Sequence, residues 1–161
     1  MQEPPPANEL LAELARFAAQ VASRVCDGAV SWKEGVAEGS WSLTEVVCHL
    51  RDVEREVHQR RLKALIEEPG AFLSGAVADD WAEERGYREQ NGPEALAAFL
   101  AAREETVRLL HELDESMWAH RGQHAFFGST SLHELVHLMV QHDAAHWEQI
   151  MTLLATPSDS L

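Results

Sequence analysis

The sequence is poor in cysteine and has no long apolar run. Only two of its 161 residues are cysteines, Cys26 and Cys48, which is too few for the disulfide framework of a small secreted domain. No apolar run approaches the ~18 residues that a membrane-spanning helix needs. The first ten residues, MQEPPPANEL, lack the charged and apolar regions of a signal peptide. These absences predict a cytoplasmic protein without a membrane partner.

Positive charge is also scarce. The chain has 13 lysines and arginines against 27 aspartates and glutamates, which gives a formal net charge of −14. A nucleic-acid-binding surface needs a basic cluster, because it must neutralise phosphates. The basic residues Arg60, Arg61 and Lys63 lie close together but among acids. The composition therefore predicts that nucleic acid is not a partner.

What the sequence does have is helical periodicity. Apolar residues recur every three to four positions in four segments, which we expect to be helices at about 9–27, 43–68, 93–115 and 131–155. No segment shows the signals of a β-hairpin. The length fits a single domain, 1–161. We therefore predict an all-α protein, an antiparallel four-helix bundle, with an irregular stretch at 70–91 between the second and third helices.

Local signals mark the starts of three of these helices. Ser42 with Glu45, and Ser131 with Glu134, have the spacing of a capping box, in which each residue binds the backbone N–H of the other. Asn8 is a suitable N-cap for the first helix. These signals predict where the second and fourth helices begin.

Two histidines interrupt the apolar face of the fourth helix. At about 100° per residue, His142 and His146 lie in the middle of its apolar stripe. The rest of the stripe is Leu135, Met139, Ile150 and Leu153. One interpretation is a pair of neutral core histidines with separate hydrogen-bond partners. The other is a shared metal ion, since leaving a ring nitrogen unsatisfied in the core costs about 1–3 kcal/mol.

A third metal ligand should come from a facing helix, and His49 is the candidate. It lies roughly 60° from the centre of the apolar stripe of its helix, at the edge of the buried face. His58 lies roughly opposite His49 and is expected to be exposed. The spacing therefore predicts a divalent metal site formed by His49, His142 and His146.

Three segments of the sequence resemble the DinB-like family. They are GSWSLTEVVCHLRDVE (39–54), AFLAAREETVRLLHELD (98–114) and HAFFGSTSLHELVHLMVQHDAAHWEQI (124–150). The resemblance implies a four-helix bundle of the DinB/YfiT-like type, with a long connection between its second and third helices. It also implies one divalent ion held by His49, His142 and His146, and a homodimer.

Several functions fit this resemblance. The family is similar to bacillithiol transferases, mycothiol-dependent maleylpyruvate isomerases and the metal-binding bundle of ergothioneine-pathway sulfoxide synthases. This similarity favours a transferase or isomerase that acts on a small-molecule substrate with a low-molecular-weight thiol. A hydrolase that uses metal-bound water and a non-catalytic metal- or ligand-binding bundle are the alternatives. Three imidazoles leave coordination positions open and suit Zn, Ni or Fe(II).

Acid–base and ligand-contacting residues are weaker hypotheses. Glu45 lies one turn before His49, although its role could be limited to the capping box. Asp143 takes the place of the glutamate in an HExxH motif but is one methylene shorter. Tyr87, Arg88 and His124 belong to the two irregular connections, which we expect to form the mouth of the pocket, because loops on a rigid scaffold often carry specificity.

Overall fold

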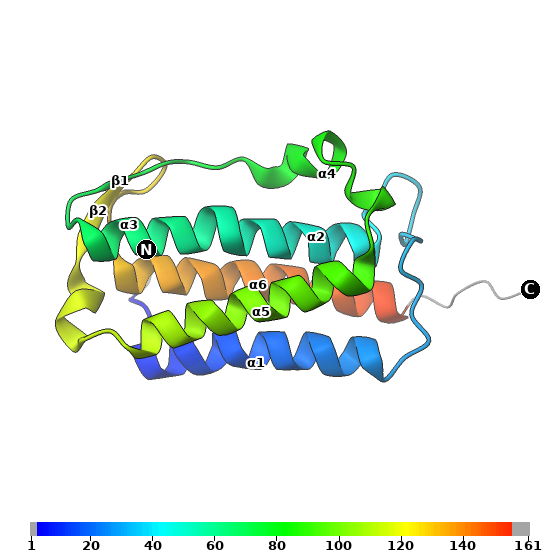
Figure 1. Ribbon diagram of the computed structural model, residues 1–161, viewed down its shortest axis with the longest axis horizontal. Coiled ribbons are helices and arrows are strands. Elements are labelled where there is room, and N and C mark those ends of the chain that lie inside the picture. Colours follow the sequence, from blue (N-terminus) through cyan, green and yellow to red (C-terminus); the bar gives the residue numbers. More distant parts are fainter. Residues whose placement is uncertain (1–2, 156–161) are drawn as a thin grey trace, which may run out of the picture.

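Four long helices form the body of the protein in a computed structural model that describes residues 3–155 (Figure 1). The bounds are Ala7–Cys26 for α1, Gly92–His111 for α5 and Leu132–Ala155 for α6. The second long helix is continuous and consists of α2 (Leu43–Val53), a π-helical turn η1 (Glu54–His58) and α3 (Gln59–Glu67). The third helix is shorter than the predicted 93–115, because the separate 3-10 turn η4 (Glu115–Ala119) follows it.

The directions of the helices alternate only in part. In Figure 1, α1 and α6 run from left to right, whereas α2, α3 and α5 run from right to left. Packing between α1 and α5, and between α2 and α6, is therefore antiparallel, but α2 and α5 pack side by side in the same direction. The expected antiparallel bundle needs this correction. The long connection after α3 carries the chain back to the end where α2 began, so α5 starts beside it.

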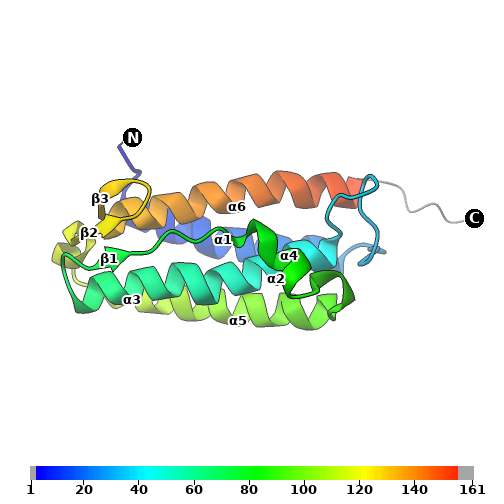
Figure 2. The same cartoon turned by 90° about the horizontal axis from the view of Figure 1, so that it is seen from above.

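That connection lies along the outside of the bundle. Viewed from above in Figure 2, it crosses between the second long helix and α6. It contains β1 (Phe72–Leu73), η2 (Ala78–Asp80), α4 (Trp81–Glu84) and η3 (Tyr87–Glu89). We call the stretch 74–80 of this connection the strap.

A small sheet corrects the all-α prediction. β1 pairs in parallel with β2 (Arg121–His124), which pairs in antiparallel fashion with β3 (Gly128–Ser131). The hairpin turn between β2 and β3 ends at Gly128, whose φ of 71° lies in the left-handed region that glycine adopts at little cost. The sequences RGQH and GSTS lack the apolar alternation of a strand. Backbone hydrogen bonds between the strands hold the sheet together, and the side-chain pattern of the sequence gives no sign of them.

The helices that carry the candidate ligands begin as predicted. The Ser42 hydroxyl accepts a hydrogen bond from the Glu45 amide at 3.3 Å, and the Ser42 amide donates to the Glu45 carboxylate at 2.7 Å. Ser131 and Glu134 make the same reciprocal pair at 3.0 and 2.7 Å. Both capping boxes are confirmed. The Asn8 cap is wrong, since α1 begins at Ala7, directly after Pro6.

Two apolar clusters fill the bundle on either side of a buried arginine. One is centred on residues such as Val46, Phe99 and Ile150, and the other is formed largely of leucines. Arg103 is only 1% exposed. Its guanidinium lies 5.1 Å from the Phe99 ring. Among the described residues, no helix combines the length and the apolar character that crossing a bilayer requires.

Candidate metal centre

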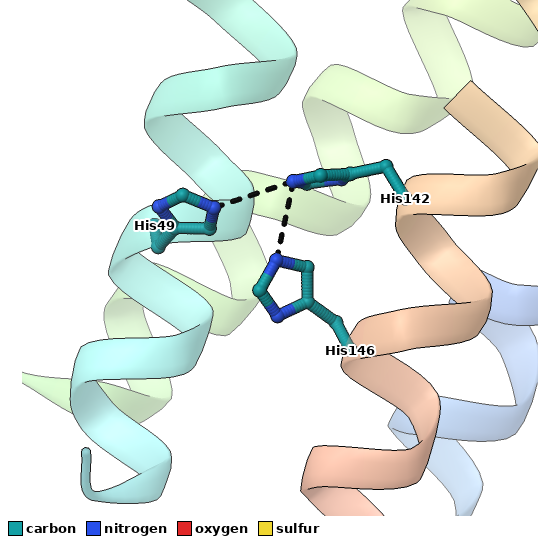
Figure 3. Close-up of side chains that lie close together, drawn as sticks. All are labelled: His49, His142 and His146. Atoms are coloured by element: carbon teal, nitrogen blue, oxygen red, sulfur yellow. Dashed lines mark hydrogen bonds between the residues drawn. The ribbon is translucent and has the colours of Figure 1, made fainter. Parts of the chain in front are cut away.

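His49 is held rigidly near the start of the second long helix. It lies one turn after Glu45, the second residue of the capping box that begins this helix, and it is only 3% exposed. The Trp41 ring, just before the cap, packs against the imidazole with ring centroids 5.1 Å apart. Packing on one face and burial on the other leave the ring directed toward α6 (Figure 3).

His142 and His146 project from adjacent turns of α6. Their ring centroids are 4.4 Å apart, as expected for residues four apart on one helix face. The Nδ1 atom of His146 donates a hydrogen bond to the Gln149 side-chain oxygen at 2.9 Å. That bond places the proton on Nδ1, so Nε2 of His146 presents a lone pair toward the other two rings.

The three rings converge on one point (Figure 3). Nε2 of His142 lies 3.3 Å from Nε2 of His49 and 3.1 Å from Nε2 of His146. One ligand nitrogen from each ring can be chosen so that all three lie within 4.8 Å of one another. The structure thus brings together the three histidines that the spacing selected. They come from two helices, and His49 and His142 are 93 positions apart in the sequence.

Burial keeps these imidazoles neutral. Burial, together with the nearby His146 and against the opposing effect of Asp52, lowers the pKa of His49 from 6.5 to about 4. Burial likewise lowers the pKa of His142 to about 2, aided by the charges of His58 and His146. The pKa of His146 is lowered mainly by burial, against the opposing effects of Gln149 and Asp79. Neutral imidazole is the form that binds metal.

The arrangement fits a divalent metal ion better than a hydrogen-bonded cluster. A single proton on Nε2 of His142 cannot serve two facing lone pairs equally well. Nδ1 of His49 and Nδ1 of His142 are buried and have no hydrogen-bond partner among residues 3–155, so no hydrogen bond at Nδ1 fixes the tautomer of either ring. Two imidazole nitrogens bound to one tetrahedral zinc ion at about 2.0–2.1 Å lie about 3.3 Å apart, which matches the two separations that involve His142.

A pocket of about 350 Å³ opens directly onto the three histidines. The second long helix lines one side of it, and residues 76–79 of the strap line another. Figure 2 shows the strap running along the bundle between this helix and α6. The lining residues other than the three histidines are Val53, Val57, His58, Arg61, Ala76, Val77, Ala78 and Asp79. Any coordination position not filled by imidazole would face this space, which is at the small end of the range for ligand pockets.

The π-helical turn η1 brings a fourth histidine to the centre. His58 lines the pocket, and its ring lies 5.3 Å from that of His142 at an interplanar angle of 80°. Nine residues after His49, it would lie about 180° away on a regular α-helix. The π-turn takes up one extra residue, so the two side chains are only about 80° apart. The expectation that His58 is exposed is therefore wrong.

The two carboxylates considered for catalysis are both engaged elsewhere. Asp143 is 3% exposed and accepts two hydrogen bonds from Arg103, at 2.7 and 2.9 Å. Glu45 completes the capping box and lies 3.7 Å from the Arg88 guanidinium. Neither residue lines the pocket. The carboxylate that does line it, Asp79, belongs to the strap and was not singled out from the sequence.

The three candidate contact residues also lie outside the pocket lining. Tyr87 is fully buried and donates a hydrogen bond to Asp52 at 2.7 Å. Arg88 is exposed on η3. His124 is buried on β2, with its ring 4.8 Å from that of Phe127. The irregular connection does border the pocket, but through the strap rather than through Tyr87 and Arg88.

The fold and the histidine cluster together define a four-helix-bundle protein with a candidate metal centre. The sequence profile of the DinB superfamily matches residues 18–150, so the chain belongs to this superfamily. A solved structure with a similar fold is YfiT from Bacillus subtilis, described as a probable metal-dependent hydrolase with an unusual four-helix bundle topology. The TM-score is 0.81 at 18% identity, over 95% of this chain and 89% of YfiT. No curated protein matches the chain.

The neutral histidines predict acid sensitivity in the metal-free protein. Their pKa values are lower in the folded protein than the ordinary 6.5, so unfolding takes up protons below about pH 6.5. Each such group removes about 1.4 kcal/mol of stability per pH unit as the pH falls toward its folded pKa. We expect the urea midpoint of chelator-treated protein to drop between pH 7.5 and pH 5.

The control for this prediction is the variant with both His142→Ala and His146→Ala. It lacks two of the groups that take up protons, so its urea midpoint should depend less steeply on pH over the same range. All other titrating groups are shared by the two proteins. Equal pH dependence in both would show that these rings do not govern the acid response.

Proposed function

We propose that this protein is a metal-dependent enzyme that holds one divalent ion, Zn, Ni or Fe(II), through His49, His142 and His146. The proposed activity is that of a transferase or isomerase, with a low-molecular-weight thiol as co-substrate and a small molecule as substrate. The observation that carries it is the convergence of three neutral imidazoles at the edge of a pocket. A closed structural site would surround the ion with four protein ligands.

The protein's own residues would supply binding, orientation and exclusion of water. A bound divalent ion would lower the pKa of a thiol or water at an open coordination position. Gln149 fixes the tautomer of His146, and Trp41 holds the ring of His49 in place. Val53, Val57 and Val77 give the pocket apolar walls that would pack against the alkyl part of a ligand.

The two carboxylates considered above for catalysis are both engaged elsewhere, which favours the thiol reaction. Asp143 is paired with Arg103, and Glu45 is committed to the helix cap. A metal-activated thiol needs less help from a protein base than water does, because its pKa starts near 8.5. A hydrolase is the second candidate. It is favoured by the description of YfiT and by Asp79, whose carboxylate lines the pocket and raises the pKa of His146.

A ligand titration tests the proposal. Protein loaded with Co(II) would be titrated with bacillithiol, mycothiol, glutathione and coenzyme A. We expect at least one of them to give a sulfur-to-metal absorption band and to release about one proton per thiol bound. His49→Ala should abolish the band, whereas His137→Ala, on the same helix as His142 but outside the pocket, should retain it.

The same experiment separates the alternatives. Metal-dependent turnover of a generic ester or amide, without thiol binding, would show that the protein is a hydrolase. The absence of both across Zn, Ni, Mn and Fe(II) would leave a binding bundle. A homodimer and a cytoplasmic location complete the proposal; the first rests on the family resemblance and the second on the sequence features described above.

A further inference from the structure

Arg61 lies on the pocket wall in line with His49. The residues of the second long helix that face the pocket include His49, Val53, Val57 and Arg61, each four positions after the last. On a regular α-helix this row would drift by about 40° per step, and Arg61 would lie about 120° from His49. The extra residue in η1 reduces that angle to about 20°. The π-turn therefore directs a guanidinium into the same pocket as the histidines.

The Arg61 guanidinium is hydrogen-bonded along one edge but forms no ion pair with a carboxylate among residues 3–155. Nε and Nη2 of Arg61 donate hydrogen bonds to the Ser74 carbonyl oxygen, at 3.2 and 2.7 Å. Arginine has five N–H donors, so several are left over. No carboxylate among residues 3–155 lies within 4.0 Å of it, although the chain has twice as many acidic as basic residues (27 against 13).

The other arginines that are not fully exposed behave differently. Among the described residues these are Arg51, Arg85 and Arg103. Each has a carboxylate oxygen at 2.7 to 2.9 Å. A half-buried charge without a counter-ion lowers stability, and burial does lower the pKa of Arg61. Arginine nevertheless stays protonated in proteins, so the pocket contains a permanent cation without an acidic partner.

Two side chains of opposite charge line the pocket, Arg61 from the second long helix and Asp79 from the strap. Arg61 lowers the pKa of His58 on the same helix and of His124 on β2. Asp79, from the strap, acts on His146 instead. The lining otherwise consists of apolar residues and neutral imidazoles. A ligand with an anionic group would therefore be drawn to the Arg61 side of the pocket.

We propose that Arg61 is the anion-binding residue of this pocket, and that the ligand is a small molecule whose carboxylate or other oxyanion binds Arg61 while its reactive group faces His49, His142 and His146. This inference rests on the proposed function for the position of the reactive group. It adds the chemical class of ligand and the residue that selects it. Arginine suits the task because its planar fork can bind a carboxylate through two parallel hydrogen bonds.

Paired thiols test the selectivity. Co(II)-loaded protein would be titrated with ω-mercaptocarboxylates of two to six carbons and with their uncharged amides, and the sulfur-to-metal band would report binding. For the chain length that spans the pocket, we expect the acid to bind at least about ten-fold more tightly than the amide, a typical size for a hydrogen bond to a charged group. Arg61→Gln should remove the preference, and Arg60→Gln, an exposed neighbour, should keep it.

A second measurement needs neither a metal ion nor ligand binding by a variant protein. In metal-free protein labelled with 15N, the Nε–Hε resonance of Arg61, assigned by its loss in Arg61→Lys, should shift on addition of propionate and not of propionamide. If neither thiol series gives a band but this resonance shifts, the proposed function fails and the anion site stands. If the band appears with equal affinity for acids and amides and the resonance does not move, Arg61 only anchors Ser74 and this inference is overturned.

Discussion

Protein purified without chelator or affinity tag is expected to carry about one divalent ion per chain, and the double variant His142→Ala, His146→Ala to carry almost none. Three imidazoles are the fewest protein ligands in common catalytic zinc sites. Removing two of the three proposed ligands leaves only His49, and a single imidazole cannot hold an ion through purification. Elemental analysis by mass spectrometry gives the content directly. His137→Ala removes a histidine from the same helix outside the pocket and should keep the wild-type content.

A stability measurement checks the same site independently. An ion that binds only the folded protein raises its stability in proportion to the logarithm of the ion concentration over Kd. Chelation should therefore lower the Tm of the wild type and of His137→Ala, and should leave the Tm of the double variant unchanged. Wild-type metal content in the double variant, or an equal response to chelator in all three proteins, would show that the ion lies elsewhere.

The candidate metal centre was predictable because its signals are local. His142 and His146 are four residues apart in an apolar stripe, and that spacing alone places them on one face of a helix. The capping boxes at Ser42 and Ser131 involve residues only three positions apart. They marked the starts of both helices, and the apolar stripe from Val46 to Val57 placed His49 at the edge of the buried face.

His58 and Arg61 could not be placed in this way. Their directions depend on one extra residue in the π-turn η1, and a helical wheel with a uniform angle puts both on the wrong face. The turn is held by a long-range contact, because its first residue, Glu54, is completely buried against Arg103 of α5. A contact between residues 49 positions apart leaves no trace in a window of neighbouring residues.

The strap and the sheet were hidden for a different reason. Segment 74–80 has neither helical nor strand periodicity, and its N-terminal end is held by β1 pairing with β2 and by Ser74 accepting from Arg61. The directions of whole helices could not be predicted from the sequence either, because they depend on the path of this connection. Sequence patterns thus described the faces of the helices, while the place of the strap beside the pocket came from tertiary contacts alone.

The strongest test of the fold is Arg103→Met, which should destabilise the protein by about 3–5 kcal/mol, the usual result of removing one partner of a buried ion pair. Arg103 binds both Glu54, at 2.8 and 3.0 Å, and Asp143, at 2.7 and 2.9 Å. It also donates to the Leu14 carbonyl oxygen. Its loss would leave two buried carboxylates without a cation. For a protein of this size we expect the Tm to fall by roughly 6–20 °C.

The pH dependence and a second variant identify the cause. Burial raises the pKa of Asp143 to about 6 even beside the guanidinium, and removing Arg103 raises it further. Folded Arg103→Met then binds more protons than the unfolded chain, so its stability deficit relative to wild type should shrink as the pH falls from 8 to 5. Combining Arg103→Met with Glu54→Gln and Asp143→Asn should recover much of the loss, because no unpaired charge remains. The exposed Arg108→Met, on the same helix, should change stability by less than about 0.5 kcal/mol. A deficit that is independent of pH and persists in the triple variant would mean that Arg103 acts through packing on Phe99 and Phe17, whose rings lie 5.1 and 5.7 Å from its guanidinium, and not through its charge.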